Sequence, residues 1–186
     1  VLDPTTGKTT ELPSGFQSSS FIANDETAVS CSSSYSDGNS TCTGWDWNNG
    51  EPVQRWQQTY DVTSIAPLWH HADGTPSSAS IAVSVQSSPK DSTSIGVLST
   101  NDGSLVNLSP EKNGQGHPIQ LLSASDGWVI IDPDSSTAST FSKKGAPAES
   151  FALRGSTASL LIKDGHQPSL SQFQAAYESG DTSWAD

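Results

Sequence analysis

The chain of 186 residues is acidic, with 20 Asp and Glu against 8 Lys and Arg and a formal net charge of −12 at pH 7. Nucleic-acid binding requires clustered cations that neutralise phosphates, and the eight scattered Lys and Arg do not provide them. The longest apolar runs are far shorter than the roughly 18–20 residues of a transmembrane helix. The low hydrophobic content of 32% and the abundance of Ser, Thr, Gly and Asn instead favour an all-β domain outside the cytoplasm.

A unit of strand, polar turn and second strand recurs along the chain. Its turns carry Asp or Asn together with Gly, which takes a positive φ at little steric cost. The clearest copies are VLDPTTGKTTELP (1–13), TGWDWNNGEPVQRWQ (43–57) and IGVLSTNDGSLVNLS (95–109), and looser copies are WVIIDPDSSTASTF (128–141) and SLLIKDGHQPSLS (159–171). Further β-like runs lie between the copies, at 18–23, 27–35, 79–88 and 149–155.

The spacing of these units predicts the architecture. Many short strands separated by turns indicate an antiparallel sandwich, barrel or propeller. Repetition at about 40–55 residues favours propeller-like blades over an immunoglobulin-like sandwich. We therefore expect an all-β region over 1–168, made of about four antiparallel propeller-like blades or forming a fragment of a larger propeller. Residues 169–186 are expected to form a short helix and tail packed on that region.

The helix is expected to begin near residue 169. Ser171 and Gln174 have the spacing of a capping box. One face of the helix would carry the apolar side chains Leu170, Phe173 and Tyr177.

Cys31 and Cys42 are the only cysteines, and they flank the polar stretch SSSYSDGNST. The Asp37-Gly38 dipeptide in this stretch is a strong hairpin-turn signal. The spacing matches neither a zinc site nor a redox CxxC motif. We expect a structural disulfide, which would place the chain in an oxidising compartment, with two free thiols as the alternative.

The N-terminal copy suggests how the assembly closes. The chain starts at Val1 with what reads as the middle of a strand, so it is expected to be an excised piece of a longer protein or to have lost a targeting segment. In a closed assembly, the hairpin 1–13 would pair with the final β segment and protect its edge. Its apolar residues would then be buried near Phe151, Leu153, Leu160 or Leu161.

The units VLDPTTGK and GWDWNNGEPVQRWQ resemble the repeats of pyrroloquinoline-quinone-like and WD-type β-propeller proteins, in which an apolar strand ends in Asp, a short turn reaches Gly and a Trp-bearing strand follows. Trp45, Asp46, Gly50, Val53 and Trp56 match the whole pattern, whereas the later copies lack the second-strand Trp. The resemblance implies a blade architecture. It implies no quinone cofactor, because most proteins with such repeats bind none, and we expect no cofactor.

The tryptophans of the 43–57 unit are candidate ligand-binding residues. Trp45 and Trp47 would share one face of a strand, and Trp56 lies on the strand that follows. Exposed aromatic rings stack on sugars or anchor protein partners. The alternative is that these large side chains fill the space between blades.

Other candidate sites are less specific. His70 and His71 would point to opposite faces of a strand, so we expect no metal site there. Asp132 could form an acid–base pair with Asp134 or Glu149, although Asp-Pro-Asp is also common in turns. We assign no catalytic residue.

Three functions follow from these patterns. The first is a non-catalytic binding or scaffold module of an exported or cell-surface bacterial protein, tethered through flanking sequence and binding a protein or a glycan. The second is a carbohydrate-binding or glycoside-acting module that uses Trp45, Trp47 and a carboxylate pair. The third is an extracytoplasmic sensor domain of a membrane-anchored receptor.

Overall fold

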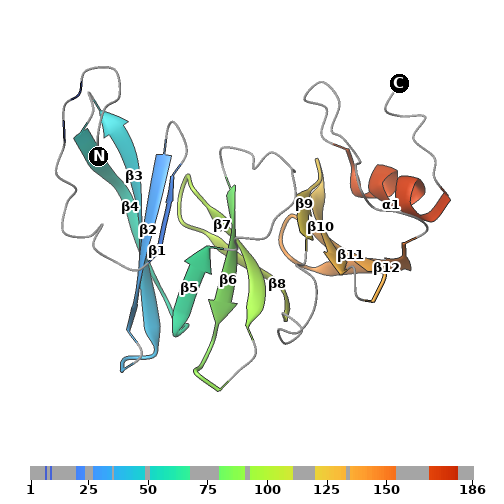
Figure 1. Cartoon of the computed structure of the whole chain (residues 1–186), viewed down its shortest axis with the longest axis horizontal. Helices are drawn as coiled ribbons and strands as arrows, with labels where there is room; N and C mark the ends of the chain where they lie inside the picture. The colour runs from blue at the N-terminus through green and yellow to red at the C-terminus, as the bar shows by residue number, and fades with distance from the viewer. Residues whose placement is uncertain are drawn as a thin grey trace. The chain divides into compact units, whose positions relative to one another are not determined.

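The computed structural model of the chain describes residues 7, 9, 20–23, 27–34, 36–48, 51–67, 80–90, 93–110, 120–132, 135–153 and 168–179. In these residues it has twelve strands, arranged in three antiparallel sheets, and one short helix near the C-terminus (Figure 1). The all-β prediction with one C-terminal helix is thereby confirmed. The chain divides into two compact units: Val1–Leu68 with Ser77–Lys112, and Trp69–Pro76 with Asn113–Asp186.

The first sheet contains four strands in chain order, each paired with the next: β1 (Ser20–Ala23), β2 (Thr27–Ser34), β3 (Asn39–Asn48) and β4 (Glu51–Tyr60). The predicted turn at Asp37-Gly38 connects β2 to β3. Gly38 has a φ of 68°, and its N–H donates to the carbonyl of Ser34 at 3.0 Å. This geometry is the reason for glycine at the position, because a side chain disfavours positive φ.

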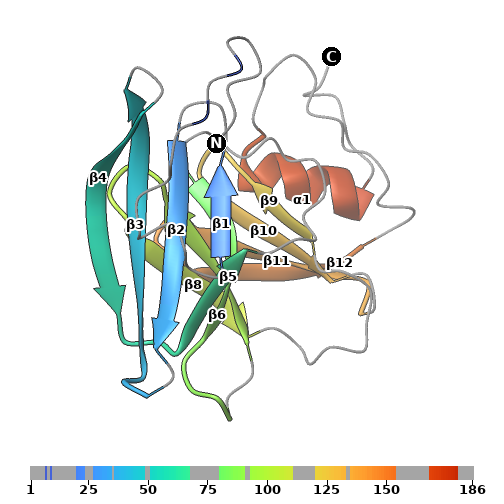
Figure 2. The same cartoon turned by 60° about the vertical axis from the view of Figure 1, so that its left-hand side comes forward.

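The second sheet repeats this order with β5 (Ser64–Pro67), β6 (Ser80–Gln86), β7 (Ser94–Ser99) and β8 (Leu105–Pro110). Its first strand lies beside β1, as Figure 2 shows. One apolar cluster joins the facing sides of the two sheets. It comprises Val29, Cys31, Cys42, Trp56, Val62, Ile65, Val83, Val85 and Leu98.

The second unit contains the third sheet, whose strands β9 (Gln120–Ser123), β10 (Gly127–Asp132), β11 (Thr137–Ser142) and β12 (Pro147–Ala152) again pair in chain order. Helix α1 (Leu170–Ser179) packs against β10 and β12 (Figure 1). The predicted apolar face of the helix is confirmed. Phe173 and Tyr177 are buried against this sheet, and Leu170 is partly buried beside them.

The capping box of α1 differs from the predicted one. The side chain of Gln172 accepts a hydrogen bond from the N–H of Ser169 at 2.7 Å, and the Ser169 hydroxyl accepts one from the N–H of Gln172 at 3.3 Å. The prediction of Ser171 and Gln174 was therefore wrong by two residues. The physical reason lies outside the helix: the Asp126 carboxylate accepts a hydrogen bond from the N–H of Leu170 at 2.8 Å and fixes the first turn there.

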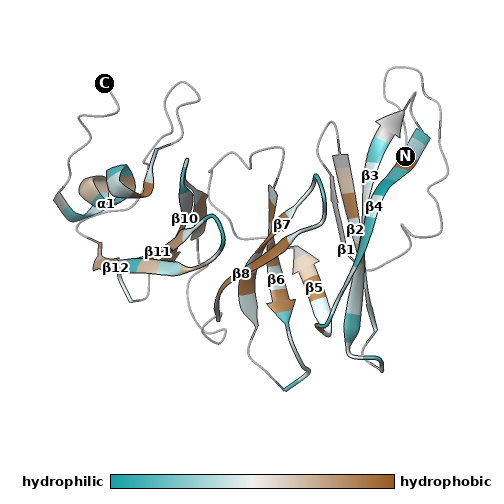
Figure 3. Cartoon of the chain, turned by 180° about the vertical axis from the view of Figure 1, so that it is seen from behind, coloured by the Kyte–Doolittle hydropathy of each residue, from teal (hydrophilic) through white to brown (hydrophobic). Residues whose placement is uncertain are grey.

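All three sheets bury side chains on both faces. In the first sheet, Val29 and Cys42 are buried on one face, and Ala28 and Trp45 on the other. In the second, Val83, Val85 and Leu98 alternate with the buried Ile95 and Val97 along the paired strands. In the third, Val129 and Ile131 alternate with the buried Ile130. Figure 3 shows the resulting apolar runs along β6, β7 and β8, in contrast to the hydrophilic β4. An antiparallel sheet with one solvated face would show strict alternation instead.

Several predictions concern other parts of the chain. The hairpin 1–13 lies outside the described residues except for Gly7 and Thr9, and Gly7 has the positive φ, 67°, that its turn was expected to need. The copy at 159–171 and the contact partners Leu160 and Leu161 are also outside them, apart from the start of α1. The closure of the assembly and the boundary at residue 168 stay predictions.

Candidate functional site

The β3–β4 hairpin positions the tryptophans that the sequence singled out. Gly44 pairs with Trp56 and Trp45 with Gln54, so the register shifts by one residue between Gly44 and Trp45. This bulge leaves Arg55 as the extra residue of β4. Because Trp56 is the partner of Gly44 and neighbouring residues of a strand face opposite sides, Trp45 and Trp56 point to opposite faces of the first sheet.

Trp56 connects the first sheet to the second. Its indole N–H donates to the carbonyl of Thr100 at 2.7 Å, and its side chain is buried. The ring lies against two glycines: a Cβ on Gly44 would come within 2.2 Å of it, and a Cβ on Gly103 within 2.7 Å. Only glycine leaves room for the ring at these positions, so the indole fits between the β3 backbone and the β7–β8 turn.

Tyr60 holds the same turn from the end of β4. Its hydroxyl donates to the carbonyl of Gly103. Burial, with added repulsion from the Asp102 carboxylate, raises the pKa of Tyr60 to about 12. The turn is itself ordered by Asp102, whose carboxylate accepts a hydrogen bond from the N–H of Ser104 at 3.0 Å. That bond and one from the Ser99 side chain hold the pKa of Asp102 below its ordinary value. We call Trp56, Tyr60 and the turn Thr100–Gly103 the aromatic clamp.

Trp45 occupies the interior on the other face of the sheet. Its indole N–H donates to the hydroxyl of Ser30 at 3.0 Å, and its ring packs with Ala28. A stacking platform for a sugar needs an exposed ring face. Both Trp45 and Trp56 are buried and hydrogen-bonded, which is the environment that the packing alternative expects. The side chain of Trp47 lies outside the described residues, and ligand binding at Trp47 stays a prediction.

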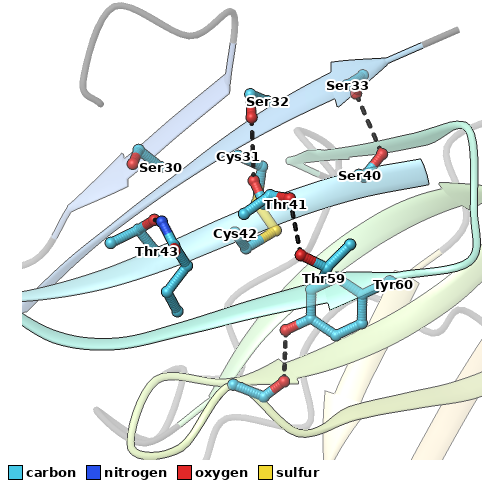
Figure 4. Close-up of a disulfide and its surroundings, with 12 residues drawn as sticks. Ser30, Cys31, Ser32, Ser33, Ser40, Thr41, Cys42, Thr43, Thr59 and Tyr60 are labelled. Atoms are coloured by element: carbon cyan, nitrogen blue, oxygen red, sulfur yellow. Dashed lines mark hydrogen bonds between the residues drawn. A yellow bond between two sulfur atoms is a disulfide. The ribbon is translucent and has the colours of Figure 1, made fainter. Parts of the chain in front are cut away.

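The disulfide between Cys31 and Cys42 is present, as predicted. The two residues are direct cross-strand partners on β2 and β3, with their Cα atoms 4.1 Å apart. Figure 4 shows the bond among hydroxyl side chains of the hairpin, with Tyr60 nearby. Cys42 is fully buried and Cys31 is 6% exposed, so the bond belongs to the apolar cluster between the two sheets.

The predicted carboxylate pair is not assembled from its described members. In the strand register, Asp132 pairs with Thr137, and Thr137 pairs with Ala152. Glu149 lies three residues away from Ala152 along β12. Strand geometry then puts the backbones of Asp132 and Glu149 roughly 14 Å apart. Asp134 lies outside the described residues, so its pairing with Asp132 stays a prediction.

The remaining candidates concern metals and membranes. His70 and His71 lie outside the described residues. Within the part of the chain that the structure describes, no three His, Cys, Asp or Glu side chains group closely enough to hold a metal ion. No helix in that part has the length and apolar character needed to cross a membrane.

Sequence reasoning missed the partners that hold Trp56. Thr100 and Gly103 belong to a turn that the Asn101-Asp102-Gly103 sequence does predict. No local signal connects this turn to β4, because the contact spans 44 positions. No protein-family model matches the chain, and no curated protein matches it in sequence.

Proposed function

We propose that the chain is a non-catalytic binding or scaffold module built from propeller-type blades, in a bacterial protein exported to the cell surface or beyond. The observation that carries this proposal is the repeated sheet. Three times in succession, four strands form one antiparallel sheet in chain order, and each such sheet buries side chains on both faces. Stacked blades of a propeller have this topology and need two buried faces.

Strand lengths and positions also support blades. The first strands β1, β5 and β9 have four residues each, and they begin at Ser20, Ser64 and Gln120, close to the spacing expected of blade repeats. In the first unit, β5 packs beside β1 and β2. The first strands of neighbouring blades meet in this way near the axis of a propeller.

The proposed location rests on the disulfide. A Cys31–Cys42 bond forms and persists in oxidising compartments and is rare in the reducing cytosol. The net charge of −12 identifies no partner.

The glycosidase alternative provides the sharpest test of a non-catalytic role. The full chain is incubated with a panel of chromogenic glycosides and oligosaccharides, beside a variant carrying Asp132→Asn and Asp134→Asn, the carboxylate pair that stays a prediction. The proposal expects no turnover by either protein. Turnover by the native chain that the variant lacks would replace the proposal with the glycoside-acting alternative.

A glycan microarray tests which kind of ligand the module binds. Binding that Trp47→Ala abolishes and Trp56→Phe preserves would support a carbohydrate-binding module. An array without hits would leave a protein as the expected partner.

A further inference from the structure

The disulfide lies in the middle of the aromatic clamp. On the inner face of the first sheet, three rows of paired residues follow one another: Val29, Gly44 and Trp56, then Cys31, Cys42 and Gln58, then Ser33, Ser40 and Tyr60. The rows before and after the disulfide therefore carry Trp56 and Tyr60, the two side chains that hold the β7–β8 turn. The cysteines and Trp56 belong to one buried cluster, and Tyr60 packs against it.

Reduction must displace the sulfur atoms of the disulfide. A disulfide holds its two sulfurs at about 2.05 Å, whereas two thiols approach only to van der Waals contact, roughly 1.5 Å further apart. Cys42 is fully buried and Cys31 nearly so, in a close-packed cluster with Trp56. Close-packed interiors contain few voids, so the separated sulfurs have to push their neighbours.

The polar end of the hairpin offers a reductant a route to the buried bond. Beyond the disulfide, β2 pairs with β3 as far as the turn through Ser32 with Thr41, Ser33 with Ser40, and Ser34 with Asn39. On its other side β3 is also held by β4, so β2 is the strand that can separate at this end. The side-chain bonds from Ser32 to Thr41 and from Ser40 to Ser33 are long, at 3.4 Å each. Segments with few apolar contacts open locally at low free-energy cost, without global unfolding.

We propose that Cys31–Cys42 is a thiol–disulfide switch that controls how tightly Trp56 and Tyr60 hold the β7–β8 turn. A dithiol reductant supplies two electrons and two protons. The S–S bond breaks, Cys31 and Cys42 become thiols, and the reductant is oxidised to its own disulfide. Reduction loosens the clamp and oxidation tightens it. This inference is independent of the proposed binding role.

The indole N–H groups of Trp56 and Trp45 provide a reporter and an internal control. Both are buried donors on the same sheet, but Trp56 faces the disulfide side and Trp45 the opposite side. Their hydrogen-exchange rates are measured by NMR on the ¹⁵N-labelled full chain, before and after treatment with dithiothreitol and again after reoxidation. Trp56→Phe assigns the reporter signal.

The switch predicts that reduction proceeds without denaturant and speeds exchange at Trp56 at least tenfold, with less than a twofold change at Trp45 and recovery on reoxidation. A bond that resists dithiothreitol until the protein unfolds would overturn the proposal. Unchanged exchange at Trp56, or equal acceleration at both indoles, would also overturn it.

A double variant separates sulfur displacement from the loss of a cross-link. Cys31→Ala with Cys42→Ala removes the link and the sulfur atoms together. The proposal predicts slower exchange at Trp56 in this variant than in the reduced native chain. Exchange as fast as in the reduced chain would contradict displacement as the cause.

Discussion

Trp56 combines apolar packing, a hydrogen bond and close fit against glycine at one position. Its N–H satisfies the Thr100 carbonyl, and its ring fills the space left by Gly44 and Gly103. A buried carbonyl that loses its donor costs about 1–3 kcal/mol, in addition to the lost packing. Through these contacts the buried Trp56 side chain joins the first sheet to the second.

Replacing Trp56 tests this role. Trp56→Phe removes the donor and part of the ring, so we expect the free energy of unfolding to fall by about 2–3 kcal/mol in urea titrations. Arg55→Ala is the control, because the exposed ion pair with Asp46 at 3.3 Å contributes little. Similar small losses in both variants would show that the clamp does not stabilise the unit.

Gly44 is required for a different physical reason than Gly38. A Cβ at Gly44 would meet the Trp56 ring at 2.2 Å, whereas a Cβ at Gly38 has open space and meets only the cost of a positive φ. Gly44→Ala should therefore lower the melting temperature clearly more than Gly38→Ala, for which a loss of about 1 kcal/mol is expected. The reverse order, measured by circular dichroism, would contradict the placement of the ring.

The raised pKa values of Tyr60 and Tyr177 make the stability of the fold dependent on pH in the alkaline range. Burial raises both pKa values to about 12, above the ordinary value of 10. The folded state therefore binds more protons than the unfolded state in this range, and stability falls as the pH rises from about 10 to 12. Unfolding titrations should show this fall, and Tyr60→Phe should reduce it. If the free energy of unfolding depended on pH in the same way in Tyr60→Phe and in the native chain, the raised pKa of Tyr60 would be contradicted.

The helix α1 shows how distant contacts select between two local signals. The sequence predicted a capping box of Ser171 with Gln174, whereas the structure forms one of Ser169 with Gln172, next to the N–H of Leu170 that the Asp126 carboxylate accepts. Ser169→Ala should cost about 1 kcal/mol of stability, and Ser171→Ala less than about 0.5 kcal/mol. Thermal melts of the two variants test this. A larger loss of stability for Ser171→Ala would favour the capping box of Ser171 with Gln174.

Sequence patterns predicted the strands that carry strong local signals. The Asp37-Gly38 turn, the paired cysteines and the β-branched runs of β6, β7 and β10 can each be recognised within a few residues. The strands β5 and β9 were missed, because four-residue segments such as Ser64–Pro67 are too short to show a period. Trp56 burial was weighed but not settled, since its partners lie in a turn distant in sequence.

At the scale of the whole molecule, composition and repetition predicted the class of fold more firmly than the function. Short strands and turns rich in Asp, Asn and Gly predict antiparallel sheets, and proteins with many unrelated functions share such sheets. Burial of both faces is the property that the strand patterns did not show. It is also what separates a stack of blades from a sheet with one solvated face.

The most direct test of the propeller-type architecture is a crystal structure of the full chain. A propeller requires the three sheets in chain order around one axis, and we expect β1, β5 and β9 nearest to it and β4, β8 and β12 outermost. Sheets packed as a two-layer sandwich, or two units without a shared axis, would contradict this architecture and remove the basis for the proposed function.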